Sequence, residues 1–155
     1  MKLQTELSAL ALPTTAEVMV GIDIGSTTVK ILVVRGGEVV YSCYERHFSR
    51  VREKTLELME EIAPLLRDAP FTLAITGSAG YGMARTASLP FVQEVFATGE
   101  TVRRLQPDTN VVVELGGEDA KVIFFDGGTD ERMNGSCAGG TGALSTRWPP
   151  CWTFR

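Results

Sequence analysis

The sequence lacks the two best-known phosphate-binding motifs. The P-loop pattern Gly-x-x-x-x-Gly-Lys-Ser/Thr is absent, and neither of the glycine-rich turns described below opens a helix in the Gly-x-Gly-x-x-Gly manner. These absences exclude a P-loop NTPase and argue against a doubly wound dinucleotide fold. A nucleotide site in this chain therefore has to be built in another way.

The sequence also lacks an excess of positive charge and long apolar runs. The 155-residue chain has a net charge of −4, so it offers no basic surface for nucleic acid or an anionic membrane. Its apolar runs are only as long as strands, and residues 1–17 lack the basic start and apolar stretch of a signal peptide. Three cysteines, Cys43, Cys137 and Cys151, show no framework of paired spacings, so a reducing, cytoplasmic location is expected.

Two glycine-rich segments of one design stand out from this ordinary composition. The first runs from Gly21 to Lys30 (GIDIGSTTVK) and the second from Val113 to Lys121 (VELGGEDAK). In each, an apolar run meets an acidic residue, turns on glycine and returns as an apolar run. Because glycine has no Cβ, a phosphate can approach the backbone N–H groups of such a turn. Two hairpins of this kind facing each other would hold one nucleotide from both sides.

The acidic residues of the two hairpins are Asp23 and Glu114. We expect them to hold a hydrated Mg²⁺, because this ion keeps most of its waters and takes only one or two carboxylates. The alternative is that both segments are ordinary tight hairpins, since one glycine-rich turn is a weak motif. The repetition of the design favours the nucleotide site.

The expected elements indicate a mixed α/β sheet with flanking helices. Residues 1–16 read as a polar lead-in, and Gly36-Gly37 as a two-residue turn. Strands are expected at Val18–Ile24, Thr28–Arg35, Glu38–Glu45, Phe71–Thr76, Val111–Leu115 and Ala120–Phe125. Helices are expected from an N-cap at Ser49 to about Arg67, over a short stretch at Met83–Ala87, and from about Pro90 to Leu105. The first helix has one apolar side, which is predicted to face the core: Val51, Thr55, Leu58, Met59, Ile62, Leu65 and Leu66.

The most specific segment is Asn134–Gly142 (NGSCAGGTG), in which Cys137 precedes a glycine-rich turn. A lone cysteine in such a place is usually a small buried residue. Together with the two hairpins, however, the segment resembles the activator ATPases of 2-hydroxyacyl-CoA dehydratases and benzoyl-CoA reductases, the BadF/BadG/BcrA/BcrD type. This family lies within the acetate kinase, sugar kinase, Hsp70 and actin superfamily. The resemblance covers roughly Val18 to Ala143.

The resemblance implies a ribonuclease-H-like fold, of which residues 17–143 form the N-terminal ATPase subdomain. It also implies that ATP cleavage drives an electron from a 4Fe-4S cluster into an acyl-CoA dehydratase or reductase. In the family the cluster lies between the subunits of a homodimer or of an internal pseudo-dimer, and Cys137 matches one of its ligands. The residues that match the nucleotide site are Asp23, Gly25, Ser26, Thr27, Thr28 and Lys30, then Glu114, Gly116, Gly117 and Asp119, then Gly139, Gly140, Thr141 and Gly142.

Among these residues, Asp23, Glu114 and Asp119 are the expected catalytic group, although the family commonly has Asp where Glu114 stands. The loop from Thr76 to Gly82 matches a family loop near the nucleotide. Two other functions stay open. A phosphotransferase of the sugar kinase or acetate kinase type would use Asp119 as its acid and leave Cys137 incidental. A non-catalytic ATP-binding scaffold would assemble when nucleotide is added.

Residues 144–155 do not continue the pattern. They contain both tryptophans and a Pro-Pro pair without periodicity, where the family begins an amphipathic helix. One permissible back-translation of this segment, read two bases further on, encodes a pattern typical of such a helix. We therefore expect a frame-shifted tail on a partial chain that is inactive alone, with an ordinary terminal tail as the alternative. Sequencing the coding DNA checks this: a single-base insertion or deletion near the Ala143 codon should restore a long open frame, and the expectation is wrong if none does.

Overall fold

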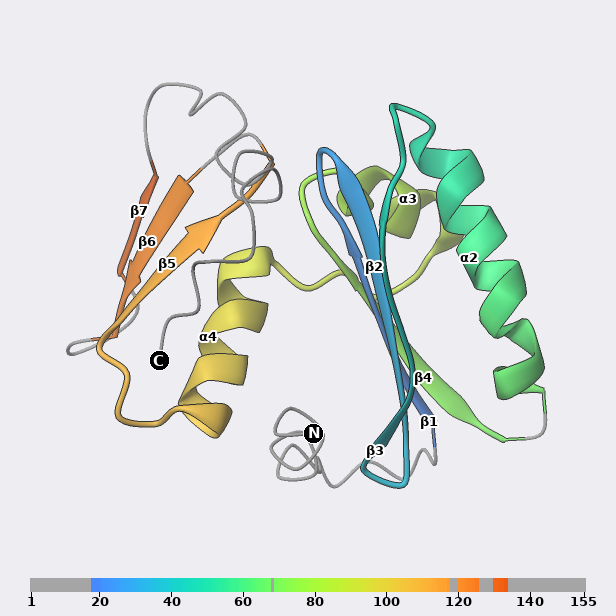
Figure 1. Cartoon of the computed structure of the whole chain (residues 1–155), viewed down its shortest axis with the longest axis horizontal. Helices are drawn as coiled ribbons and strands as arrows, with labels where there is room; N and C mark the ends of the chain where they lie inside the picture. Colours follow the sequence, from blue (N-terminus) through green and yellow to red (C-terminus); the bar gives the residue numbers. More distant parts are fainter. Residues whose placement is uncertain (1–17, 68, 118–119, 126–129, 134–155) are drawn as a thin grey trace, which may run out of the picture. The chain divides into compact units, whose positions relative to one another are not determined.

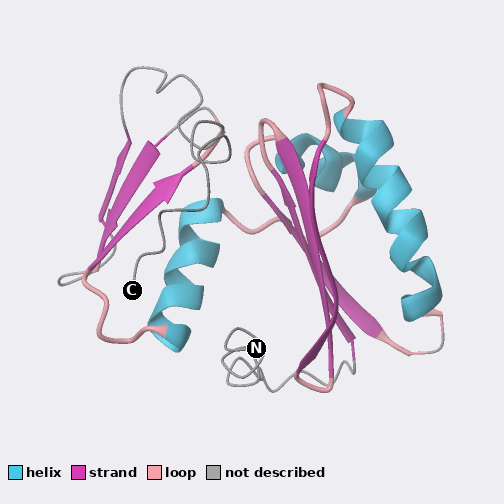
Figure 2. Ribbon diagram, in the orientation of Figure 1, coloured by secondary structure: helices cyan, strands magenta, loops and turns pink. Residues whose placement is uncertain are grey.

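The computed structural model describes residues 18–67, 69–117, 120–125 and 130–133. The chain divides into two compact units, Met1–Asp108 (unit 1) and Thr109–Arg155 (unit 2). Unit 1 contains both strands and helices, whereas the regular elements described in unit 2 are all strands (Figures 1 and 2). Within the described residues, no helix combines the length and the apolar character needed to span a membrane.

Unit 1 is built on a four-stranded sheet in the order β3-β2-β1-β4. Its strands are β1 (Val18–Ile24), β2 (Thr28–Arg35), β3 (Glu38–Arg46) and β4 (Phe71–Thr76). The first three are antiparallel neighbours, and β4 pairs with β1 in parallel. Gly36 and Gly37 join β2 to β3 with φ values of +56° and +86°, a conformation that glycine adopts without strain, as the sequence predicts.

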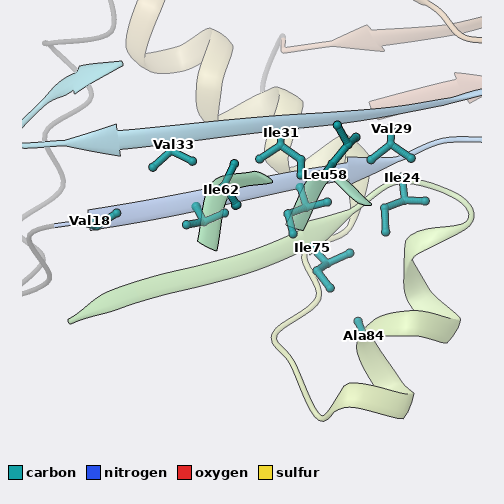
Figure 3. Packing of buried hydrophobic residues seen from close by; sticks show 11 residues of the cluster. Val18, Ile24, Val29, Ile31, Val33, Leu58, Ile62, Ile75 and Ala84 are labelled. Carbon is teal, nitrogen blue, oxygen red and sulfur yellow. The ribbon is translucent and has the colours of Figure 1, made fainter. Parts of the chain in front are cut away.

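One face of this sheet is covered by α2 (Val51–Leu66) (Figure 1). Alternation along the strands turns Val18, Val20, Ile22 and Ile24 toward the helix. Leu58 and Ile62 from α2 meet them, and both are fully buried (Figure 3). The apolar side predicted for this helix is confirmed: Thr55, Leu58 and Ile62 are buried, and Val51, Met59, Leu65 and Leu66 pack against the same core.

The predicted N-cap of the first helix and the predicted start of the last helix are wrong. Ser49 does not cap α2; the N-cap is Arg50 without a side-chain bond, and Ser49 lies in a turn with φ +65°. The last helix of unit 1, α4 (Glu94–Leu105), begins later than Pro90. Residues 90–92 are instead extended, because Pro90 O accepts from Ile75 N (2.9 Å) and Val92 N donates to Ile75 O (2.8 Å). These bonds satisfy backbone groups of β4 that a helix at Pro90 would leave unpaired.

The remaining elements follow the expected order with small shifts. The helix α3 covers Gly80–Ala87 and so begins earlier than predicted. In unit 2, β5 (Val111–Leu115), β6 (Ala120–Phe124) and β7 (Asp130–Met133) form an antiparallel sheet in the order β5-β6-β7. The strand β7 was not expected from the sequence, since its residues, DERM, lack a strand's usual apolar alternation.

Candidate functional site

The first glycine-rich segment forms the predicted hairpin between β1 and β2. Asp23 and Lys30 face each other across it, and Lys30 Nζ lies 2.6 Å from Asp23 Oδ2. The turn is closed by a bond of 2.9 Å from Gly25 N to Thr28 O. The hairpin therefore presents one carboxylate, one ammonium group and a short glycine turn in a single place.

Burial and the surrounding charges both act on Lys30. Burial lowers its pKa, but the hydrogen bond and the charge of Asp23, together with Tyr44 and Glu94, outweigh this effect, so the pKa is raised above its ordinary value. Lys30 is therefore protonated at neutral pH. In the absence of a ligand it neutralises Asp23, and in the presence of an anion it could turn toward it.

Two buried oxygen atoms beside this ion pair have no hydrogen-bond partner among the described residues. They are Asp23 Oδ1 and Thr76 Oγ1, and their residues are Cα partners across the parallel β1–β4 pair. A buried polar atom without a partner costs free energy unless a ligand or water satisfies it. A hydrated cation would satisfy both types of acceptor, so this corner of the sheet fits the Mg²⁺ that the sequence predicts.

Gly77 allows the chain after β4 to approach Asp23 closely, because glycine has no Cβ. Its φ is +92°, and a Cβ at this position would collide with Asp23 Oδ1 and the carbonyl oxygen of Ile24. Ala79 N also donates to Ile24 O (2.9 Å), which ties the glycine loop after β4 to the end of β1. The start of the Thr76–Gly82 segment therefore lies against the first hairpin.

A hollow of about 420 Å³ lies on the sheet face opposite α2. The Cα pairings place Gly21 beside Leu32 and Ala74, and Asp23 beside Lys30 and Thr76, all among its lining residues. Apolar side chains form most of its floor, and the polar groups gather at the hairpin end. A pocket of this kind can accept an apolar ring system whose charged group reaches the hairpin.

The second glycine-rich segment forms a hairpin between β5 and β6. Glu114 and Lys121 are Cα partners, and Lys121 Nζ lies 3.8 Å from Glu114 Oε1. This is the arrangement of Asp23 and Lys30 in the first hairpin, with the same spacing along the chain. The two hairpins thus share their register as well as their acid-to-lysine spacing.

The expected site residues divide by location. Asp23, Gly25, Ser26, Thr27, Thr28 and Lys30 lie together in the first hairpin, and Glu114, Gly116 and Gly117 lie in the second. Asp119, Cys137, Gly139, Gly140, Thr141 and Gly142 lie outside the described residues. Among the described residues, no group of three or more His, Cys, Asp or Glu side chains could hold a metal ion.

The sequence did not single out Gly77, Lys121 or His47. Lys121 could have been found from the equal acid-to-lysine spacing of the two hairpins. Gly77 could not, because only the structure shows how closely it approaches Asp23. His47 reaches the first hairpin from the far end of β3, where its Nε2 lies 3.2 Å from Gly25 O.

Comparison with known proteins finds relatives that are similar over most of this chain. The chain is 29% identical over 130 residues to the (R)-2-hydroxyglutaryl-CoA dehydratase activating ATPase of Acidaminococcus fermentans, across 79% of this chain and 48% of the relative. It is 33% identical over 126 residues to the uncharacterized protein YjiL of Escherichia coli, across 79% of this chain and 48% of that protein.

Solved structures agree with these relatives. The activator of the 2-hydroxyisocaproyl-CoA dehydratase from Clostridium difficile with bound ADPNP superposes with a TM-score of 0.63 at 27% identity, covering 82% of this chain and 49% of that one. The chain therefore spans about half the length of the proteins it matches. Residues 20–146, which include both hairpins and Cys137, match the BadF/BadG/BcrA/BcrD ATPase family, and the chain belongs to that family.

Proposed function

We propose that this chain supplies the first part of an ATP-dependent activator, one that delivers an electron to an acyl-CoA dehydratase or reductase. The observation that carries the proposal is the repeated hairpin, with Asp23 opposite Lys30 and Glu114 opposite Lys121. The relatives named as dehydratase activators, one of them solved with an ATP analogue, support the same function. Three cysteines without paired spacings suit a reducing compartment such as the cytoplasm.

In this proposal, the residues of unit 1 bind the phosphates and the metal. Asp23 Oδ1 and Thr76 Oγ1 would hold a hydrated Mg²⁺ by accepting hydrogen bonds from its waters, since this ion keeps most of them. Lys30 leaves Asp23 Oδ2 and contacts a phosphate oxygen, while the backbone of Gly25, Ser26 and Thr27 surrounds the phosphate. Positive charge then lies where hydrolysis develops negative charge, which is how phosphoryl transfer is accelerated.

The hairpin of unit 2 is proposed to contribute to nucleotide binding in the same way, with Glu114, Gly116 and Gly117 as its contacts. Asp119 and the turn at Gly139, Gly140, Thr141 and Gly142 complete the proposed site. Cys137 is proposed to supply one thiolate of a 4Fe-4S cluster shared with a second subunit or pseudo-subunit. The cluster, when bound, would supply the low-potential electron that is passed to the partner.

The test needs a protein of full family length. We define the hybrid as residues 18–143 of this chain followed by the C-terminal half of the Acidaminococcus fermentans activator. An activator should purify under anaerobic conditions as a brown, iron-containing protein, hydrolyse MgATP and restore activity to the (R)-2-hydroxyglutaryl-CoA dehydratase when a low-potential reductant is present. ATP-dependent phosphorylation of a small substrate, with no iron, would favour the phosphotransferase. Assembly on ATP addition without turnover would favour the scaffold.

Replacing Cys137 with alanine in the hybrid should remove the bound iron and leave MgATP binding intact. Thiolate ligation and phosphate binding use different atoms of neighbouring segments. Iron is measured by colorimetric assay and ATP binding by calorimetry. The matched control is Cys43→Ala, which removes a cysteine of β3 that is not proposed as a cluster ligand and should keep the iron. Full iron content in the Cys137 variant would show that this cysteine is a structural thiol.

A further inference from the structure

The chain's single histidine connects the first hairpin to the turn between β3 and α2. His47 follows β3 directly and is only 4% exposed. Its ring Nε2 lies 3.2 Å from Gly25 O, and its backbone N donates to Thr27 O over 3.2 Å. One residue therefore binds two carbonyl groups of the same glycine turn.

The hydrogen bonds of the ring fix its tautomer. Ser49 N donates to Nδ1 of His47 over 3.1 Å, so Nδ1 carries the lone pair. The ring proton of the neutral imidazole then lies on Nε2, which donates it to Gly25 O. Both ring nitrogens are thus used, one for the hairpin and one for the turn.

The turn that holds the ring is strained. Phe48 and Ser49 have φ values of +48° and +65°, and two consecutive residues other than glycine rarely adopt this region. Such strain persists only where neighbouring contacts impose it, and it is most often found at functional positions. The Ser49 N–H bond to the ring is one of those contacts, and the bond from Arg50 N to His47 O (2.8 Å) is another.

The contact with Gly25 O determines where the next amide points. In a trans peptide the C=O of one residue and the N–H of the next lie on opposite sides of the bond, and the described chain has no cis peptides. With Gly25 O directed at the His47 ring, the N–H of Ser26 is directed away from it. A turn without this contact could rotate the Gly25–Ser26 peptide and lose that orientation.

We propose that His47 is a positioning residue for the first phosphate loop. It holds the Gly25 and Thr27 carbonyl groups on the side of the β3–α2 turn, so that the loop presents the Ser26 N–H on its other side to a phosphate. The loop is then pre-organised before nucleotide arrives, and the histidine itself touches no substrate. The phosphate part of this role rests on the proposed function, whereas the hold on the loop does not.

Two substitutions separate the two ring contacts. His47→Asn keeps an acceptor near the Nδ1 position, which can still bind Ser49 N in an Asx turn, but it cannot reach Gly25. His47→Gln places a donor amide near the Nε2 position and loses the acceptor for Ser49. The readout is amide hydrogen exchange, measured residue by residue by NMR on the 155-residue chain without nucleotide. The amide of Gly25, bonded to Thr28 O, reports on the loop.

In His47→Asn we expect the Gly25 amide to exchange about tenfold faster, the factor that one lost hydrogen bond is worth, with the β1–β2 ladder unchanged. In His47→Gln we expect the Gly25 rate to return to within about threefold of the parent. Equal acceleration throughout the ladder, loss of folding in both variants, or an unchanged Gly25 rate in His47→Asn would overturn the proposal. Because no nucleotide is present, failure of the hybrid to bind MgATP would contradict the proposed function and leave this result standing.

Discussion

Replacing Gly77 with alanine should remove about 3 kcal/mol or more of the free energy of unfolding of unit 1. The φ of Gly77 is +92°, and a Cβ there would collide with the carbonyl of Ile24 and with Asp23 Oδ1. The loop cannot shift freely, because Ala79 N is bonded to Ile24 O. A side chain that is forced into both strain and overlap produces losses of this size. Urea denaturation of the 155-residue chain, followed by circular dichroism, measures the change.

Gly82 supplies the matched control for this substitution. It lies within α3, and a Cβ there would meet nothing within 4 Å. Gly82→Ala should therefore leave stability unchanged or raise it by up to about 1 kcal/mol, since alanine favours a helix more than glycine does. If the two variants had equal midpoints, the close approach of Gly77 to Asp23 would be wrong.

Replacing Asp23 with alanine should lower MgATP turnover of the hybrid by about 100-fold or more. The carboxylate supplies one buried oxygen without a hydrogen-bond partner and also binds Lys30. Removing a carboxylate that orients a metal ion's ligands typically costs 10- to 100-fold in metal affinity or activity, and the proposed site loses the partner of its lysine as well. Steady-state phosphate release at saturating Mg²⁺ measures the effect.

Two further variants show whether the charge of Asp23 or merely its bulk is needed. Asp23→Asn keeps the size of the side chain and should be nearly as impaired as alanine, because an amide interacts more weakly with a hydrated cation. Glu38→Ala removes an exposed carboxylate at the start of β3 and should leave turnover unchanged. Full activity in Asp23→Asn would show that the carboxylate charge is not required.

The hairpins and the core were predictable from the sequence because each depends on local pattern. Alternating apolar residues define β1 and β2, and the apolar side of α2 follows from helical spacing. The glycine turns between strands identified the two hairpins for the same reason. These features need no knowledge of distant contacts.

The features that the sequence did not predict depend on contacts between distant segments. Residues 90–92 are extended because β4 offers them hydrogen-bond partners, although Pro90 is acceptable in a helix's first turn. Serine is a favoured N-cap residue, but the Ser49 N–H donates to the His47 ring, and this bond holds Ser49 in a turn. Gly77 and His47 gain their roles only when β3 and β4 bring them to the first hairpin.

We expect nucleotide to bind both hairpins, and hydrogen exchange of the hybrid with and without a non-hydrolysable MgATP analogue measures this. The analogue should slow exchange at Gly25–Thr28 and at Gly116–Gly117 together, at the same nucleotide concentration. Slower exchange in one hairpin alone, or in neither, would contradict it.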